Sequence, residues 1–326
     1  MADSTTELYS EVFQLQKNHA LGLRNTTVKS RKEKLKKLKL WILDNQQSIR
    51  EAIHSDFQKP AEEVDSCDIY PVLSEINHAL TNLDDWAKPQ KVDAPITLIG
   101  TTAEIRYEPK GVCLILAPWN FPFNLAAGPL VSCIAAGNTA IIKPSEITPA
   151  TSDLIKKMIS EIFRPEEVAV FTGGAETAVG LLNLPFDHIF FTGSPKVGKL
   201  VMKAAAENLS SVCLELGGKS PAIIHSDVNI SDAARRIAFG KFVNNGQTCI
   251  APDYLFVHRS VADKFLSALV SETTRLFGNG TIVPGDAKSY GRISNQQHFQ
   301  RLQNILDDAI KPVSYTHLTL PTILLV

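Results

Sequence analysis

The fold of this chain is constrained most by a regular alternation of short apolar runs with helical spans, which begins at Gly111. The runs are four or five residues long and rich in β-forming side chains: Val112–Leu116, Thr139–Ile142, Val168–Phe171 and His188–Phe191. Spans with helical periodicity, such as Ser152–Ile162, separate them. Short apolar runs without polar alternation are typical of strands that are buried on both faces. The pattern therefore predicts an α/β fold, with a doubly wound parallel sheet covered by helices on both sides.

Other elements are expected on either side of this alternation. The apolar spacing over 29–54 predicts one amphipathic helix that opens the protein, and a second helix is expected over Val72–Trp86. The stretch Pro95–Tyr107 reads as a hairpin arm. Runs at Val212–Leu216 and Ala222–Ile224 begin a further α/β section, with helices over Ser231–Val243 and Val261–Phe277. The domain boundaries that we expect are 1–88 with 107–211 for one domain, 89–106 for the arm, 212–311 for a second domain and 312–326 for a tail.

Composition excludes several classes of protein. The 326 residues include 33 Lys and Arg against 34 Asp and Glu, so net charge gives no reason to expect a nucleic-acid partner. The cations between Lys29 and Lys39 are expected on a solvated helix face. Five scattered cysteines without a C-x-x-C pair indicate neither a disulfide framework nor a metal site. With no export signal and no apolar run of membrane-spanning length, a cytoplasmic location is expected.

A glycine turn at Phe191–Leu200 follows one predicted strand and precedes a helix. Free N–H groups at such a turn attract phosphates, and Gly193 permits close approach. The spacing from Gly193 to Gly198 and Lys199 nearly matches a P-loop, but Leu200 has no hydroxyl for magnesium, which disfavours a P-loop nucleotidase. The G-x-G-x-x-G fingerprint is absent. Taken alone, the motif fits a cofactor loop and an ordinary strand-to-helix turn equally well.

Cys249 is the cysteine whose setting favours chemistry. It lies in a turn between Gly246 and Pro252, where a thiolate can face a cleft. By contrast, Cys113 and Cys213 fall in apolar strands, and Cys133 falls in an apolar helix, which favours structural roles.

Four polar residues follow predicted strands. Glu215 is either a strand-end carboxylate bonded to the glycine N–H groups after it or a general base. Asn120 is either a turn residue between prolines or an amide donor at the carboxyl edge of the sheet, where open α/β sheets bind ligands. Lys143 and Glu146 are either surface charges or contacts to a ribose.

Five motifs together resemble one family. P-W-N-F-P (118–122), I-I-K-P-S-E (141–146), F-T-G-S (191–194), E-L-G-G-K (215–219) and G-Q-T-C (246–249) occur in the order and spacing of the NAD(P)-dependent aldehyde dehydrogenases. The continuation C-I-A-P-D-Y (249–254) is similar to the class 3, fatty-aldehyde branch. The resemblance implies a coenzyme domain, a catalytic domain and an arm used in oligomerisation. It also implies oxidation of an aliphatic or aromatic aldehyde with NAD or NADP, and a homodimer.

The resemblance also implies a role for each matching residue. Cys249 would be the nucleophile, Glu215 the general base and Asn120 an oxyanion donor. The residues implied to bind the cofactor are Lys143, Glu146, Gly193, Ser194, Trp119, Pro118, Leu216 and Gly217. Those implied to line the aldehyde tunnel are Tyr70, Phe121, Phe239, Val243 and Thr248.

The chain also departs from the family pattern. The family's E-E-I-F-G-P segment, whose glutamate binds the nicotinamide ribose, is absent before Val326, and the text after residue 311 is atypical of the family. A C-terminally truncated or chimaeric chain is therefore expected. The alternative function is that of a catalytically impaired nucleotide-binding fragment with the same fold.

Overall fold

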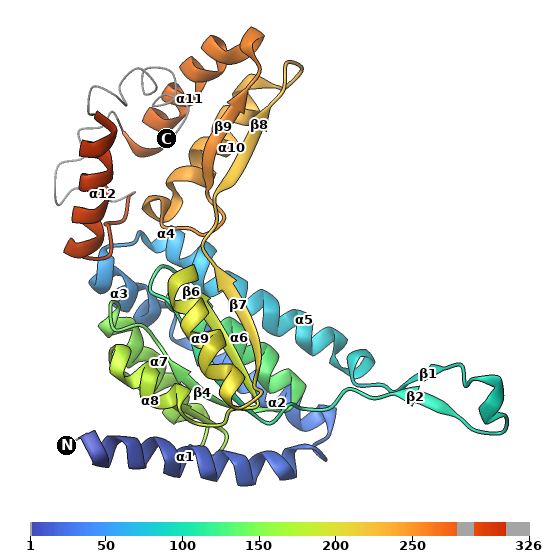
Figure 1. The fold of residues 1–326 in the computed structure, drawn as a ribbon. Coiled ribbons are helices and arrows are strands. Elements are labelled where there is room, and N and C mark those ends of the chain that lie inside the picture. The colour runs from blue at the N-terminus through green and yellow to red at the C-terminus, as the bar shows by residue number, and fades with distance from the viewer. Residues whose placement is uncertain (1, 279–289, 311–326) are drawn as a thin grey trace. The chain divides into compact units, whose positions relative to one another are not determined.

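The computed structural model describes residues 2–278 and 290–310, which form two compact units. The first unit comprises residues 2–52 and Asp65–Glu215, and the second comprises Ile53–Val64 with residues 216–278 and 290–310 (Figure 1). The helices are α1 Ala2–Leu23, α2 Val28–Asp44, α3 Gln46–Phe57, α4 Ala61–Val64, α5 Tyr70–Trp86, α6 Asn124–Ala136, α7 Pro149–Ile162, α8 Ala175–Leu182, α9 Pro195–Glu207, α10 Ile230–Phe242, α11 Ala262–Phe277 and α12 Gln296–Ile310. The strands are β1 Gln90–Val92, β2 Ala103–Ile105, β3 Val112–Leu116, β4 Thr139–Lys143, β5 Val168–Val170, β6 His188–Gly193, β7 Ser211–Leu216, β8 Ser220–Ile224 and β9 Pro252–Val257.

A five-stranded sheet in the order β5-β4-β3-β6-β7 forms the centre of the first unit. Strand β3 pairs in parallel with both β4 and β6, and β4 pairs in parallel with β5. All five residues of β3 and all five of β4 are buried. The apolar run of β3 and the apolar residues 140–142 of β4 predict this burial, whereas Thr139 and Lys143 are polar. The predicted doubly wound α/β fold is confirmed. Because the chain steps outward from β3 to β5 and then returns to β6, the order reverses between β3 and β6.

Helices cover both faces of this sheet (Figure 1). On one face, α1, α8 and α9 contribute Phe13, Leu181 and Val201 to a buried cluster with Leu114 and Ile189 of the strands. On the other face, α6 packs on β3 and β4, and α2, α5 and α7 pack around α6 and β5. The central strands are therefore removed from water on both sides.

Helix α1 was not expected, and the prediction that the helix over 29–54 opens the protein is wrong. The buried positions of α1 are three or four residues apart and include Tyr9, Phe13, Gln16 and Ala20. Gln16 interrupts the apolar stripe but is fully buried, because its Nε2 donates to the carbonyl oxygens of Ala140 (2.9 Å) and Pro165 (3.0 Å). Because Gln16 is polar, the apolar periodicity of α1 is interrupted, and hydropathy alone does not identify the buried face of this helix.

The single helix expected over 29–54 is two helices, α2 and α3, separated at Asn45. The backbone of Asn45 is non-helical (φ −116°, ψ 19°), and its side chain donates to the carbonyl oxygen of Trp41 (2.8 Å). An asparagine side chain that bonds to nearby backbone competes with helix continuation, which explains the break. Apolar periodicity continues across the break and therefore does not reveal it.

Strand β7 belongs to the five-stranded sheet, as the strand next to β6. The expectation that the run at Val212–Leu216 begins the further α/β section is therefore wrong. The strand is partly buried at Ser211–Leu214 and exposed at Glu215 and Leu216, and its local sequence does not say with which sheet it pairs.

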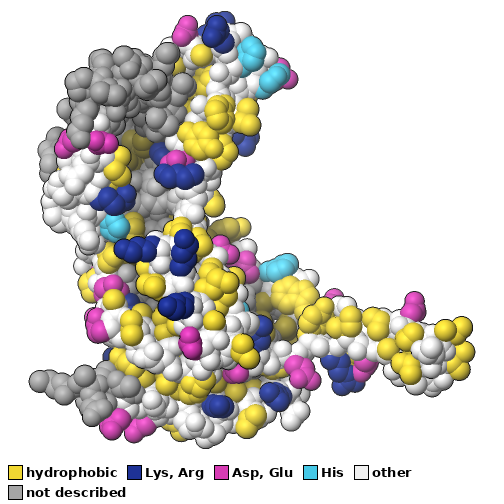
Figure 2. Space-filling view, in the orientation of Figure 1, with side chains coloured by type: hydrophobic (Ala, Val, Ile, Leu, Met, Phe, Trp, Pro, Cys, Tyr) yellow, Lys and Arg dark blue, Asp and Glu magenta, His cyan; other side chains and the backbone are white. Residues whose placement is uncertain are grey.

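The hairpin expected near residues 89–106 is present as the antiparallel pair β1 and β2. A short 3-10 helix over Ile96–Leu98 lies between the two strands. Its apolar side chains remain exposed: Ile96 and Ile99 are each 83% accessible. Figure 2 shows apolar side chains gathered at the end of this arm.

The second unit is a smaller α/β body. Strands β8 and β9 pair in parallel, and α10 packs on both β9 and α11. Ile224, Ala238, Leu255, Phe265 and Leu269 form its buried core. Across both units, none of the helices in the described part of the chain has the length and hydropathy needed to cross a bilayer.

Candidate functional site

The carboxyl ends of β3 and β6 meet where the strand order of the sheet reverses. The chain leaves β3 through Pro118, Trp119 and Asn120, which are all partly buried, and leaves β6 through Gly193 and Ser194. Open α/β sheets bind ligands in the crevice outside such a reversal. Sequence reasoning selected these residues, and the sheet brings them to one edge of the first unit.

Ser194 shapes the start of α9. Its Oγ accepts a hydrogen bond from the N–H of Val197 (3.3 Å), and Pro195 occupies the first helical turn. A serine cap followed by proline begins a helix precisely where the strand-to-helix turn was expected. Gly193 has no room for a side chain, because a Cβ there would lie 2.5 Å from the ring of Phe191. A side chain at position 193 would therefore require the Phe191 ring to move.

Lys143 and Glu146 form an ion pair at the end of β4. The Lys143 Nζ lies 2.6 Å from Glu146 Oε2, and the lysine side chain is 8% accessible whereas the glutamate is 48% accessible. The carbonyl oxygen of Lys143 also accepts from the N–H of Ala117, which follows β3 (3.0 Å). The buried Lys143 side chain thus orients the exposed Glu146 carboxylate near the carboxyl end of β3.

Two glycines at the end of β5 were missed by the sequence analysis. A Cβ on Gly173 would lie 2.1 Å from Thr177 Oγ1, and Gly173 has a left-handed φ of +143°. The N–H of Gly174 donates to Glu176 Oε1 (2.9 Å), and this bond, with that from the N–H of Glu176 itself, lowers the pKa of the Glu176 carboxyl. A strand followed by T-G-G and a helix resembles the turn at Gly193, and this similarity was the signal that could have found the pair.

A dinucleotide fits the residues at this edge. The buried hydroxyl of Thr192 makes no hydrogen bond with any described residue, although it lies between Phe191 and Gly193 in β6. An orphaned buried hydroxyl is a favourable contact for a polar ligand. Together with Gly193 and the carboxylate of Glu146, it offers the donors, acceptors and backbone access that a nucleotide requires.

Cys249 lies in an exposed turn of the second unit, as expected from its neighbours. The three residues that lead into the turn, Asn244, Asn245 and Gly246, all have left-handed φ values, between 55° and 69°. The cysteines expected to be structural are less accessible: Cys113 and Cys133 are buried and Cys213 is partly buried. A hydrogen bond with Cys113, together with burial, raises the pKa of the Cys133 thiol, which keeps that thiol protonated.

The chain segment after Glu215 reaches the turn of Cys249. Glu215 and Leu216 end strand β7 and are exposed, and Gly217 and Gly218 follow them. A Cβ on Gly218 would lie 2.6 Å from the backbone oxygen of Cys249, a distance at which only glycine fits. Among the described residues, no atom lies within 4 Å of the corresponding position on Gly217. Packing against the backbone of Cys249 therefore requires glycine at position 218 of the E-L-G-G motif, and packing within the described residues does not require it at position 217.

The residues expected to line an aldehyde tunnel are distributed over both units. Tyr70 begins α5 and is exposed, and Phe121 is partly buried, both in the first unit. Phe239 of α10 is exposed, Val243 is buried, and Thr248 has a buried hydroxyl without a hydrogen bond among the described residues. Phe239, Val243 and Thr248 belong to the unit that carries Cys249.

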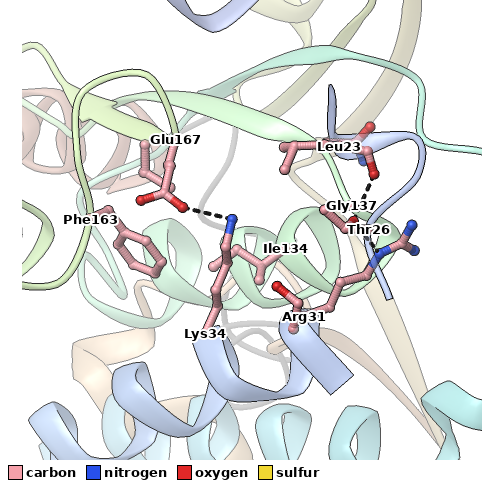
Figure 3. Close-up of a pocket in the computed structure, with 11 residues that line it drawn as sticks. Leu23, Thr26, Arg31, Lys34, Ile134, Gly137, Phe163 and Glu167 are labelled. Atoms are coloured by element: carbon pink, nitrogen blue, oxygen red, sulfur yellow. Dashed lines mark hydrogen bonds and ion pairs between the residues drawn. The ribbon is translucent and has the colours of Figure 1, made fainter. Parts of the chain in front are cut away.

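The cavities found in the first unit lie away from these residues. One, of about 10 Å³, lies at the amino ends of β4 and β5, where Lys34 of α2 pairs with Glu167 (2.7 Å) and Arg31 Nε donates to Thr26 Oγ1 (3.3 Å) (Figure 3). Such a volume holds about one water molecule. Arg31 and Lys34 were expected on a solvated face, but both make tertiary contacts. Lys34 pairs with Glu167, and Arg31 donates to the carbonyl oxygens of Ala135 and Ala136 at the end of α6.

A larger cavity of about 470 Å³ lies near the base of the hairpin arm. It is lined by apolar and aromatic side chains that include Leu83, Trp86, Tyr107 and Ala136. It contains none of the residues expected to bind a cofactor or a substrate.

Comparisons with known proteins agree with the family resemblance of the five sequence motifs. Residues 1–314 match the model of the aldehyde dehydrogenase family. AldX of Bacillus subtilis is 46% identical over 300 residues, which cover 92% of this chain and 67% of AldX. Mouse aldehyde dehydrogenase family 3 member B3 is 39% identical, with 94% of this chain and 63% of that protein covered. The substrate-bound structure of Staphylococcus aureus AldH is 43% identical, with a TM-score of 0.87, and the match covers 92% of this chain and 65% of AldH. The chain thus spans about two thirds of the length of these relatives, and the resemblance to the class 3 branch is confirmed.

Proposed function

Because the chain belongs to the aldehyde dehydrogenase family, we propose that it oxidises an aldehyde to the carboxylic acid through a thioester on Cys249. Exposure of Cys249 in a strained turn is the observation that carries this proposal. A thiolate there is accessible to a carbonyl carbon, to which sulfur adds to give a tetrahedral thiohemiacetal. The other cysteines of the described chain are less accessible and do not offer this chemistry.

Asn120 is proposed as the oxyanion donor. As the thiolate adds, the carbonyl oxygen acquires negative charge, which the Asn120 side-chain amide and the backbone N–H of Cys249 would hold. One such donor typically contributes about 3 kcal/mol to the stability of the transition state. Support comes from the place of Asn120 at the carboxyl edge of the sheet, next to the reversal of strand order.

The proposed cofactor is NAD or NADP, which accepts the hydride that leaves the tetrahedral centre. The exposed carboxylate of Glu146, oriented by Lys143, would accept hydrogen bonds from the adenosine ribose. Gly193 and Ser194 would bind the phosphates through backbone N–H groups at the start of α9. Pro118, Trp119, Leu216 and Gly217 are proposed as further contacts.

Glu215 is proposed as the general base that activates water against the thioester. Its carboxylate is exposed at the end of β7, and Gly218, three residues further along the chain, contacts the backbone of Cys249. Hydrolysis of the thioester returns the thiol and releases the carboxylic acid.

The substrate is proposed to be a medium-chain or long-chain aliphatic aldehyde, or an aromatic one. The proposed tunnel residues Tyr70, Phe121, Phe239 and Val243 present aromatic and aliphatic surface, with Thr248 beside the nucleophile. Such walls suit an apolar tail and offer no charge for a polar one.

The test is NADH formation from hexanal, followed by absorbance. The assay uses this chain and a second protein, called the extended chain. The extended chain is this chain joined to the part of AldX that the match does not cover. Cys249→Ser should abolish oxidation, whereas Cys67→Ser, the change of a partly buried cysteine in the first unit, should retain it. Equal rates in wild type and Cys249→Ser would overturn the mechanism. Binding of NAD without oxidation in the extended wild-type chain would instead support the impaired nucleotide-binding alternative.

A further inference from the structure

The segment that leads into the turn of Cys249 has an unfavourable backbone conformation. Asn244 (φ 55°, ψ 30°) and Asn245 (φ 55°, ψ 35°) are both left-handed, and Gly246 (φ +69°) continues in the same region. Left-handed backbone is unfavourable for an ordinary residue, less so for asparagine, and is readily adopted by glycine. Two successive asparagines in this conformation persist when surrounding contacts hold them.

The side chain of Gln247 supplies the densest set of these contacts. Its Nε2 donates to the carbonyl oxygens of Asn244 (3.1 Å) and Arg292 (3.0 Å). Its Oε1 accepts from the N–H of Ser294 (3.0 Å). One amide group thus joins the left-handed turn to a segment 45 to 47 residues away along the chain.

Two further bonds connect the same segments. Asn245 Nδ2 donates to the carbonyl oxygen of Gly291 (3.3 Å). The N–H of Arg292 donates to the carbonyl oxygen of Phe57 (2.9 Å), at the end of α3. The segment Gly291–Ser294 is therefore bonded on one side to the turn and on the other to residue 57.

Glu63 closes this set of contacts from α4. Its Oε2 accepts from the N–H of Asn244 (2.8 Å), the first left-handed residue. Residues 57–63, the turn 244–247 and the segment 291–294 thus form a closed hydrogen-bonded frame within the second unit, and Cys249 follows the frame by two residues.

We propose that Gln247 is a positioning residue that fixes the direction of the Cys249 thiol by holding this frame. The proposal rests on the proposed role of Cys249 as the nucleophile. The amide of Gln247 is suited to the task because it donates twice and accepts once. A carboxylate of the same length accepts but cannot donate, and a thioether accepts only weakly. A displacement of about 1 Å at a reacting group can cost on the order of a hundredfold in rate.

The test measures alkylation of Cys249 by iodoacetamide across pH, resolved by peptide mass spectrometry on the 326-residue chain. Gln247→Met keeps the length of the side chain and removes its hydrogen bonds. We expect it to change the limiting alkylation rate at Cys249 by about threefold or more. The rates at Cys67 and Cys213 report on overall folding, and they should stay unchanged. Gln300→Met is the matched control, because Gln300 lies exposed on α12 and its side-chain hydrogen bond among the described residues stays within its own helix, to Asn304 (2.9 Å).

A second pair of variants keeps the proposal testable if Gln247→Met fails to fold. Glu63→Ala removes the acceptor for the N–H of Asn244 and should alter the Cys249 profile, and Glu63→Gln retains an acceptor oxygen and should restore it. A wild-type profile in both Gln247→Met and Glu63→Ala would overturn the proposal. Since alkylation needs neither aldehyde nor coenzyme, failure of the oxidation mechanism would appear separately, as an absence of NADH formation.

Discussion

A Cβ built on Gly218 would lie 2.6 Å from the backbone carbonyl oxygen of Cys249, so the two chain segments touch through backbone alone. Real Cβ atoms do not come this close to a backbone oxygen, and neither partner is the end of a flexible side chain. The second glycine of the E-L-G-G motif therefore permits the close approach of the turn that contains Cys249.

This contact predicts that Gly218→Ala displaces the turn. Overpacking of this kind typically costs about 1–3 kcal/mol, and a shifted thiol should react on the order of ten to a hundredfold more slowly with hexanal in the extended chain. Gly217→Ala is the matched comparison for thermal unfolding and for alkylation of Cys249, because the added methyl group meets no atom of the described part of the chain within 4 Å. If both variants alkylate at the same rate, the contact does not control the turn.

The ion pair between Lys143 and Glu146 makes a prediction about the cofactor. Glu146→Gln removes the charged acceptor proposed for the ribose, and hydrogen bonds to charged groups contribute about 1.5–3 kcal/mol. The dissociation constant for NAD should therefore rise by roughly ten to a hundredfold, with a smaller change for NADP. Titration monitored by tryptophan fluorescence measures both. Glu207→Gln, an equal change of charge at the exposed end of α9, should leave them unaltered. An unchanged NAD affinity in Glu146→Gln would exclude the proposed ribose contact.

The burial of Leu114 in the central strand β3 leads to a prediction about the free energy of unfolding. Leu114 is fully buried in the middle of that strand, between helical layers on both faces. Leu114→Ala should reduce the free energy of unfolding by about 2–5 kcal/mol, through lost burial and the cavity that remains. Urea unfolding followed by circular dichroism measures this change. Leu200→Ala, on the exposed face of α9 where Leu200 is 60% accessible, should change it little. Equal losses in the two variants would contradict the assignment of β3 to the core.

The raised pKa of Tyr290 leads us to expect that the free energy of unfolding depends on pH in the alkaline range. Burial, reinforced by the negative charge of Glu63, raises the pKa of Tyr290 to about 12, against about 10 in an unfolded chain. In that window the folded state keeps the phenol proton that the unfolded state has lost, so the free energy of unfolding falls as the pH rises.

The measurement compares wild type with Tyr290→Phe by urea unfolding at several pH values between about 9.5 and 11.5. Wild type should lose roughly 1 kcal/mol more than the variant, because solvent at the partly exposed ring reduces the full linkage value. The phenyl ring retains the packing against Phe277, whose centroid lies 5.3 Å away. Parallel pH profiles would show that Tyr290 does not titrate in this window.

Much of the first unit follows from local sequence. The strands β3, β4, β5 and β6 fall where apolar runs predict them, because a parallel strand covered on both faces needs apolar side chains at every position. The turns after these strands follow as well, since proline, glycine and a capping serine at 194 restrict the backbone locally. The order of the motifs was then enough to place Asn120 and Gly193 at one edge of a sheet.

What the tertiary structure decided depends on contacts between distant residues. Gln16 is buried in α1 only because carbonyl oxygens of residues 140 and 165 accept its amide protons. Strand β7 joins the first sheet through pairing with β6, which apolar periodicity cannot specify. Gln247 looks like any polar turn residue in the sequence, and its bonds to residues 292 and 294 exist only once the second unit has folded. Periodicity records which side of an element faces the core, whereas hydrogen bonds across more than forty residues are formed by the fold itself.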